Sequence, residues 1–121
     1  MSVFTSISID NYLFETDYFF VIKDKYPVSV GHLLIVSKRV VLDFFSLNVQ
    51  EKNDLILMID KCKLHIEGKY NPDGYNIGMN CGVSAGQTVM HFHCHVIPRY
   101  SGDMQKPDGG VRHCVLGKGY Y

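Results

Sequence analysis

The sequence has no excess of charge of either sign and no long apolar run. Its 12 Lys and Arg residues are balanced by 12 Asp and Glu residues. A protein that holds long nucleic acid by neutralising a row of phosphates carries a basic excess, so we expect no long nucleic acid as a partner and only a small phosphate ligand. No uninterrupted apolar run approaches the ~18 residues that a spanning helix needs, so we expect no membrane partner.

The sequence has no CxxC spacing among its cysteines. The four cysteines are Cys62, Cys81, Cys94 and Cys114. The apolar surroundings of Cys62 and Cys94 favour reduced core thiols over disulfides. The first 20 residues have no positively charged leader before an apolar stretch. We therefore expect a protein of the reducing cytoplasm.

What is present is the composition of an ordinary globular domain. Of the 121 residues, 46% are hydrophobic and 20% are charged, with 11 glycines, 4 prolines and no tryptophan. This length can bury a real core but is too short for two independent ones. Because no internal repeat, linker or low-complexity segment is visible, we predict a single domain over residues 1–121.

Four segments have the composition and alternation of β-strands. Residues 18–23 and 32–37 are rich in apolar and β-branched side chains, and a short connection with one proline and one glycine joins them. This pattern is typical of an antiparallel pair. Residues 75–80 and 88–98 alternate in character on the two sides of a glycine-containing loop, which predicts a second antiparallel hairpin.

One long helix is expected between the two hairpins. Asn48 and Glu51 have the spacing of an N-cap and its reciprocal glutamate. Apolar residues at helical spacing follow, namely Leu55, Met58, Ile59, Cys62 and Ile66. We predict an amphipathic helix over residues 49–68 and an α+β fold in which one long helix covers an antiparallel meander sheet. The segment after Arg99 has no clear period and is expected to be a short irregular tail.

Three of the six histidines form a row in the last predicted strand. His91, His93 and His95 are spaced by two, so their side chains project from one face, with about 7 Å between successive Cα atoms. A lone histidine is most often a satisfied core or surface residue, and we keep that interpretation for His65 and His113. It does not explain the row, because three protonated rings on one face would repel one another.

A metal site is an alternative interpretation of the row. Two histidines spaced by two on a strand can offer two ligands to zinc. No third and fourth ligand stands at a recognisable spacing in the sequence. This weighs against the alternative.

The sequence around the row resembles the histidine triad (HIT) superfamily of nucleotide hydrolases and transferases. The family signature is His, apolar, His, apolar, His and two apolar residues, and HFHCHVI at residues 91–97 fits it throughout. Residues 80–99 are similar to the family's loop and catalytic strand, and residues 20–38 to its nucleotide-binding hairpin. The resemblance therefore covers nearly the whole chain. AGQTV before the row and PRYSGD after it are similar to the fragile histidine triad branch, which contains dinucleoside polyphosphate hydrolases.

The resemblance implies a role for each of four histidines. His93 is expected to be the nucleophile that attacks the α-phosphorus of a nucleotide and forms a nucleotidyl-histidine, which water then hydrolyses. His95 is expected to bind the nucleotide and to donate a hydrogen bond to its phosphate oxygens. His91 and His32 are expected to support the row by holding its hydrogen bonds.

The loop before the histidine strand is expected to bind the phosphates. Glycines at positions 82 and 86 allow backbone N–H groups to turn toward an anion. The resemblance places Gly86, Gln87, Thr88 and Val89 along this phosphate site. It also implies that Gln87 orients the attacking water and that the hydroxyl of Thr88 assists the leaving group.

Other residues are expected to hold the nucleoside. Asp24 matches the position that holds the ribose hydroxyls in the family, and a carboxylate can accept two vicinal hydroxyl protons. Asn80 is expected to touch the sugar or the phosphate. Apolar residues are expected to enclose the base, with core packing as the alternative role for most of them. These are Phe4, Phe20, Ile22 and Leu34.

One departure from the family concerns zinc. Several microbial relatives hold a structural zinc through an N-terminal CxxC, a later histidine and the first histidine of the row. The matching positions here are Ser2, Thr5 and Val40, and only His91 remains. The resemblance therefore implies no metal site of that type and no required cofactor. Whether a divalent ion accompanies a polyphosphate substrate stays open.

The leading hypothesis is a dinucleoside polyphosphate hydrolase that acts on a small nucleotide substrate. A purine nucleoside phosphoramidase would use the same first step, but its branch typically ends in a tryptophan-containing segment, which is missing here. A non-catalytic nucleotide-binding protein and a metal protein built on the row are further alternatives. The resemblance also implies a homodimer that joins through the helix and an edge strand.

Overall fold

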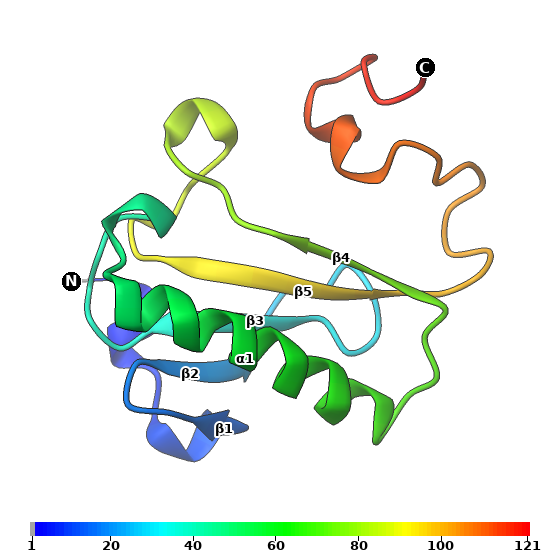
Figure 1. Cartoon of the computed structure of the whole chain (residues 1–121). Coiled ribbons are helices and arrows are strands. Elements are labelled where there is room, and N and C mark those ends of the chain that lie inside the picture. Colours follow the sequence, from blue (N-terminus) through cyan, green and yellow to red (C-terminus); the bar gives the residue numbers. More distant parts are fainter. Residues whose placement is uncertain (1) are drawn as a thin grey trace.

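The fold is built around one antiparallel sheet, seen in a computed structural model that describes residues 2–121 (Figure 1). The strands are β1 (Phe14–Glu15), β2 (Phe19–Lys23), β3 (Leu33–Ser37), β4 (Gly74–Gly78) and β5 (His93–Arg99). Their order across the sheet is β1-β2-β3-β5-β4, and each neighbouring pair is antiparallel. Short 3₁₀ helices lie outside the strands, namely η1 (Val3–Ser6), η2 (Ile9–Asn11), η3 (Phe44–Ser46), η4 (Val83–Ala85) and η5 (Gly110–Cys114).

Strands β2 and β3 are buried because their apolar sequences are almost uninterrupted. They pair over their full length, from Phe19 opposite Ser37 to Lys23 opposite Leu33. The connection between them requires Gly31, whose φ of 93° favours glycine. A Cβ at this position would also lie 3.0 Å from a ring carbon of Tyr70. The tight return brings the end of β2 beside the start of β3, which is where part of the site forms.

Helix α1 (Val49–Glu67) lies across one face of the sheet (Figure 1). It begins at a capping box, in which the N–H of Glu51 donates to the side chain of Asn48 and the N–H of Asn48 donates to the carboxylate of Glu51. Glu51 is buried and is paired with Arg39, whose Nη2 lies 2.7 Å from Oε1. The buried apolar residues of the helix follow helical spacing and are Leu55, Met58, Cys62 and Ile66. None of the helices within residues 2–121 combines the length and the apolar character needed to traverse a bilayer.

Strand β5 presents different side chains to the two faces of the sheet. Phe92, just before the strand, and Cys94 and Val96 within it belong to the core beneath α1. His93 and His95 alternate with them and are only partly buried. A second apolar cluster occupies the other face and consists of Phe4, Phe20, Ile22, Leu34 and Val36. The histidines therefore lie on the face that the helix does not cover.

The predicted α+β fold, with one long helix on an antiparallel sheet, is confirmed, and the structure differs in three details. Strand β5, not β4, pairs with β3, so the last two strands enter the sheet in reversed order. The strand predicted from residue 88 begins only at His93, because its ladder with β3 ends at the pair of Val36 and His93, and the N–H of Phe92 donates to the carbonyl of Val41 instead. The sequence does not predict β1, because two residues are too few to show alternation.

The tail after β5 is mostly irregular and is held together by side chains that bind its backbone. Arg112 donates to the carbonyls of Lys118 and Gly119, and the hydroxyl of Tyr120 donates to the carbonyl of Lys106. One 3₁₀ helix, η5, lies within it. The tail therefore has a defined local structure without a long regular element.

The four thiols are expected to react at very different rates. Burial raises the pKa of Cys62 and of Cys94 to about 12, so their reactive thiolates are scarce. Cys114 is exposed and Cys81 is partly exposed. Alkylation of the native protein, followed by intact-mass measurement, should show two early modifications and two more only in denaturant. Equal rates at all four thiols would contradict the packing beneath α1.

Candidate functional site

A cleft of about 780 Å³ opens on the face of the sheet that α1 leaves free. Its apolar lining comes from the N-terminal turns and from β2 and β3, and includes Phe4, Ile7, Tyr12, Ile22 and Leu34. Its remaining lining includes Asp24, Thr88, Val89, His93 and His95. An apolar surface thus lies beside two imidazoles and a carboxylate in one cavity.

His93 is held by the backbone in a single tautomer. Its Nδ1 lies 2.8 Å from the carbonyl oxygen of His91. A carbonyl can only accept, so Nδ1 carries the proton and Nε2 keeps its lone pair. The ring lines the cleft, and Phe4 packs edge-on against it with 5.1 Å between ring centroids. This is the tautomer that a nucleophilic imidazole requires.

His91 lies behind the cleft and is fully buried. Its Nε2 donates to the carbonyl of Ser37 at 2.7 Å, at the end of β3. Nδ1 therefore has the lone pair, and the hydroxyl of Ser2 donates to it at 2.6 Å. Both ring nitrogens are thus used within the protein, which agrees with a supporting role for His91.

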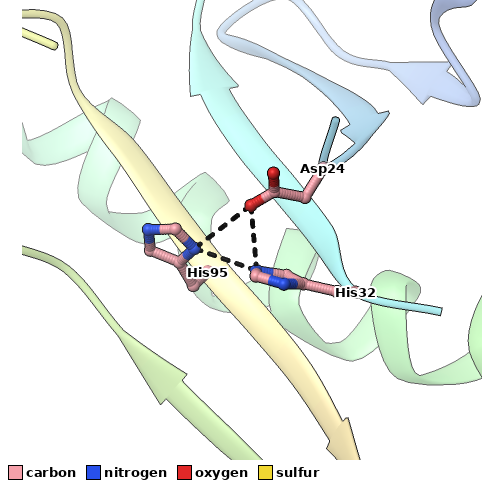
Figure 2. A group of neighbouring side chains, drawn as sticks. All are labelled: Asp24, His32 and His95. Carbon is pink, nitrogen blue, oxygen red and sulfur yellow. Dashed lines mark hydrogen bonds and ion pairs between the residues drawn. The ribbon is translucent and has the colours of Figure 1, made fainter. Parts of the chain in front are cut away.

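Asp24 follows the last residue of β2, His32 precedes the first residue of β3 and His95 lies on β5, and the three side chains point toward one another (Figure 2). The N–H of Val28 donates to Nδ1 of His32 at 3.1 Å, so the proton of His32 is on Nε2. That Nε2 donates to Nδ1 of His95 at 2.9 Å and lies 3.2 Å from Oδ2 of Asp24. His95 must then carry its own proton on Nε2, which makes this atom a hydrogen-bond donor.

The histidine row lies within the segment by which the family of this chain is identified. A family model described as the HIT domain matches residues 8–102. The chain belongs to the HIT family. The relationship to the HIT superfamily near its fragile histidine triad branch, expected from the sequence, is thereby confirmed.

One curated relative of this HIT domain is named as a triphosphatase, and two solved structures have a similar fold. A bis(5'-adenosyl)-triphosphatase of Dictyostelium discoideum is 36% identical over 95 residues, which are 78% of this chain and 64% of the relative. The crystal structure of the nitrilase and fragile histidine triad fusion protein of Caenorhabditis elegans matches 83% of this chain and 24% of its own, with a TM-score of 0.77 and 35% identity. A HIT family protein of Bacillus anthracis matches 77% of this chain and 66% of its own, with a TM-score of 0.72 and 33% identity.

The HIT domain spans only part of several relatives. It covers 61% and 60% of two uncharacterized HIT-like proteins from Mycoplasma species, and 22% of the nematode fusion protein.

Gln87 is placed differently from the role that the sequence implies. Its side chain is buried, and its Oε1 accepts from the N–H of Gly82 at 2.8 Å. Its Nε2 donates to the carbonyls of Leu42 and Val89. Because all of these partners are backbone groups, Gln87 holds the loop in shape, and it is not part of the cleft lining. Orientation of a water by Gln87 stays a prediction.

The structure brings most of the other predicted residues to the cleft. Asp24, Leu34, Thr88 and Val89 line it, together with His93 and His95. Asn80 and Gly86 lie beside each other in the loop, since a Cβ on Gly86 would be 3.7 Å from Nδ2 of Asn80, but neither is part of the lining.

The apolar lining of the cleft differs in a few residues from the set predicted to enclose the base. Phe20 stacks on Tyr12 with 4.1 Å between centroids and is not part of the lining. Ile7 and Tyr12 are, although the sequence does not single them out. Ser2 and Ser8 each cap the N–H of the residue two positions later. Serine at such a position is the signal from which the sequence could have located these N-terminal turns.

The spacing of Asp24, His32 and His95 would also suit a metal ion, since their ligand atoms lie within 4.8 Å of one another. Coordination through Nε2 of His32 would move the ring proton to Nδ1. Nδ1 already faces the N–H of Val28, so two hydrogens would then oppose each other. The hydrogen bonds at this place therefore favour a network in which each ring proton has a defined position over a metal centre.

Three histidines in and around the cleft are held neutral by their surroundings. Burial lowers the pKa of His95 to about 4, with further lowering by the neighbouring rings of His93 and His32. Burial also lowers the pKa of His32, against the opposing effect of Asp24, and it lowers the pKa of His91. At neutral pH, His95 is therefore a neutral ring with its proton on Nε2.

These lowered pKa values predict a loss of stability in acid. Between the ordinary pKa of 6.5 and about 4, the unfolded chain binds a proton at His95 that the folded protein excludes. Stability must then fall as pH falls through this window. His95 alone should lower the free energy of unfolding by about 2 kcal/mol between about pH 7 and about pH 5. Urea unfolding at the two pH values measures this, and a smaller pH dependence is expected for His95→Gln. An unfolding free energy that rises toward pH 5 would contradict it.

Proposed function

We propose that this HIT domain hydrolyses dinucleoside polyphosphates at the α-phosphate through a nucleotidyl intermediate on His93. The observation that carries the proposal is the pair of fixed tautomers in the cleft. Nε2 of His93 has a lone pair, because Nδ1 donates to the carbonyl of His91. Nε2 of His95 has a proton, because Nδ1 accepts from His32. A nucleophile and a donor for the phosphate oxygens thus stand at successive positions of one face of β5.

The reaction is proposed in two displacements. In the first, the lone pair on Nε2 of His93 attacks the α-phosphorus, a P–N bond forms, and the P–O bond to the remaining nucleotide breaks with its electrons. The hydroxyl of Thr88, which lines the cleft, is proposed to assist this leaving oxygen. In the second, water attacks the same phosphorus, one of its protons passes to the solvent, and the P–N bond breaks, which returns the lone pair to His93 and releases a nucleoside monophosphate. Nε2–H of His95 stabilises the phosphate oxygens in both steps.

The nucleotide is proposed to lie along the cleft with its base against the apolar lining. Phe4, Ile22 and Leu34 supply that surface. Asp24 is proposed to hold the ribose, since its carboxylate is within the lining and its oxygens can accept from hydroxyls. Backbone groups near Gly86 and Val89, with Asn80 beside them, are proposed to bind the phosphates. No resident cofactor enters this proposal, and a divalent ion would arrive with the polyphosphate.

The names of the relatives support this substrate class. They include the bis(5'-adenosyl)-triphosphatase of Dictyostelium discoideum and an asymmetrical bis(5'-nucleosyl)-tetraphosphatase of Schizosaccharomyces pombe, which is 38% identical over 82 residues, or 68% of this chain and 45% of the relative.

A substrate panel tests the proposed function. Diadenosine triphosphate, diadenosine tetraphosphate and an adenosine phosphoramidate should be incubated with the protein, and the products separated by chromatography. We expect AMP from both dinucleotides, at rates well above that from the phosphoramidate and without a requirement for inorganic phosphate. Hydrolysis of the phosphoramidate alone would point to the phosphoramidase alternative, and nucleotide binding without any product would point to a non-catalytic binding protein. Either result would overturn the proposal.

We further propose that the chain forms a homodimer through the outer face of α1 and the edge strand β4. Val49, Ile56 and Leu64 are exposed apolar residues spread along this one helix face, and Ile77 is exposed on β4. Light scattering should give the mass of two chains for the wild type and of one for Ile56→Glu. Val30→Glu, an equally polar change on the β2–β3 connection, should leave the dimer intact. A wild-type mass of one chain would reject the dimer.

A cytoplasmic location is proposed from the cysteines. All four are free thiols, and Cys114 is exposed. Exposed free thiols persist in a reducing compartment.

A further inference from the structure

The N-terminal 3₁₀ turn is joined to the histidine row by both packing and hydrogen bonding. Ser2 caps η1, because its Oγ accepts from the N–H of Phe4 at 3.2 Å. Its carbonyl accepts from both the N–H and the hydroxyl of Thr5. The ring of Phe4 contacts His91 and His93 edge-on, with centroids 5.5 and 5.1 Å apart. These bonds hold Ser2 in place, so it can in turn hold the side chain to which it is hydrogen-bonded.

The hydroxyl of Ser2 is the partner of a buried nitrogen of His91 that has no other partner within residues 2–121. His91 is 1% exposed, and its Nε2 is already used by the carbonyl of Ser37. The bond from Oγ of Ser2 to Nδ1 is 2.6 Å long. It locks the ring of His91 between η1 on one side and the end of β3 on the other.

The position of His91 matters because its carbonyl selects the tautomer of His93. That carbonyl lies in the bend before β5, beyond the end of the ladder with β4. The same peptide is held at its other atom, since the N–H of Phe92 donates to Val41. The His91 end of this peptide is fixed by the side chain of His91, which is itself held by Ser2.

We propose that Ser2 is a positioning residue for the nucleophile, acting through His91 to hold the carbonyl that keeps the proton of His93 on Nδ1. The inference rests on the proposed function, and it extends the site to the N-terminal turn. Without the hydroxyl, the ring of His91 is free to rotate or change tautomer, and the carbonyl that binds His93 is less well placed. Fewer molecules then carry the lone pair on Nε2 of His93.

The test compares Ser2→Ala with Ser2→Thr and with Ser8→Ala. Ser8 caps η2 through the N–H of Asp10, as Ser2 caps η1, but it binds no histidine. Ser2→Ala should lower kcat about tenfold, the effect of one hydrogen bond, with KM unchanged. Ser2→Thr should restore kcat, and Ser8→Ala should equal the wild type. Nitrogen-15 NMR of the imidazoles should show a single Nδ1–H form of His93 in the wild type and a mixture of tautomers in Ser2→Ala.

Each outcome decides for or against the inference. Unchanged kcat and an unchanged tautomer in Ser2→Ala, or an equal loss in Ser8→Ala, would overturn it. If the wild type cleaves none of the nucleotides, the proposed function fails, and the NMR comparison still decides the role of Ser2. If Ser2→Ala is unstable, failure of Ser2→Thr to keep the wild-type tautomer would equally overturn it.

Discussion

Replacing His93 by alanine is expected to lower kcat on dinucleoside polyphosphates by about 10⁴-fold or more, because the substitution removes the atom that bonds to phosphorus. The fold should survive, since His93 is only partly buried and its neighbours Cys94 and Phe92 supply the core contacts. Steady-state release of AMP, measured beside the melting temperature, tests this. KM should change far less than kcat, because the apolar lining and Asp24 remain.

His65→Ala is the matched control for His93. His65 lies on α1 against Phe14, away from the cleft lining, and should keep wild-type turnover. Turnover by His93→Ala within tenfold of the wild type would show that another group attacks the phosphate. The tautomer of His93 would then have no bearing on the chemistry.

Replacing His95 by alanine is expected to lower kcat by about 10²- to 10³-fold. The variant loses one donor that is fixed in place before the phosphate charge develops, and such donors contribute about 3–4 kcal/mol to a transition state. The loss should appear in kcat more than in KM, since the hydrogen bond strengthens as the charge grows. Steady-state kinetics over a range of substrate concentrations separates the two parameters.

His95→Gln is the informative companion of this variant. A glutamine amide can donate from nearly the same place and should recover part of the lost kcat. An alanine variant that keeps kcat and raises only KM would contradict the account, because His95 would then bind ground state and transition state equally.

Much of the fold is readable from the sequence because its signals are local. The capping box of Asn48 and Glu51 and the helical spacing behind it locate α1 to within a residue of its end at Glu67. Strict alternation from Phe92 to Val96 separates the core face of β5 from its histidine face. Both patterns depend on contacts between residues near in sequence, and these the sequence displays directly.

The order of the strands and the start of β5 depend on distant partners. Nothing in residues 75–98 says that β5 rather than β4 meets β3, because both strands can pair on either side. The bend before His93 is set by the bond from Phe92 to Val41, a residue some fifty positions earlier in the chain. Such long-range choices are made by the assembled core and leave no local pattern.

The candidate site shows the same division. The histidine row is found from sequence because three histidines at this spacing are unusual, whereas Asp24 and Thr88 are found only through the family resemblance. The buried bonds of Gln87 are not found from sequence, since an amide that holds a loop and an amide that faces a ligand look alike in sequence. The bond from Ser2 to His91 spans 89 positions and appears only in the fold.

Trapping the covalent intermediate tests the central claim most directly. The wild type should be mixed with excess diadenosine tetraphosphate and quenched within one turnover in alkaline denaturant, because P–N bonds hydrolyse in acid. Peptide mass spectrometry should then find one nucleoside monophosphate on the peptide that contains His93, and NMR of the labelled ring should place it on Nε2. Full turnover with no nucleotide on the protein, or with the nucleotide on another residue, would contradict the account.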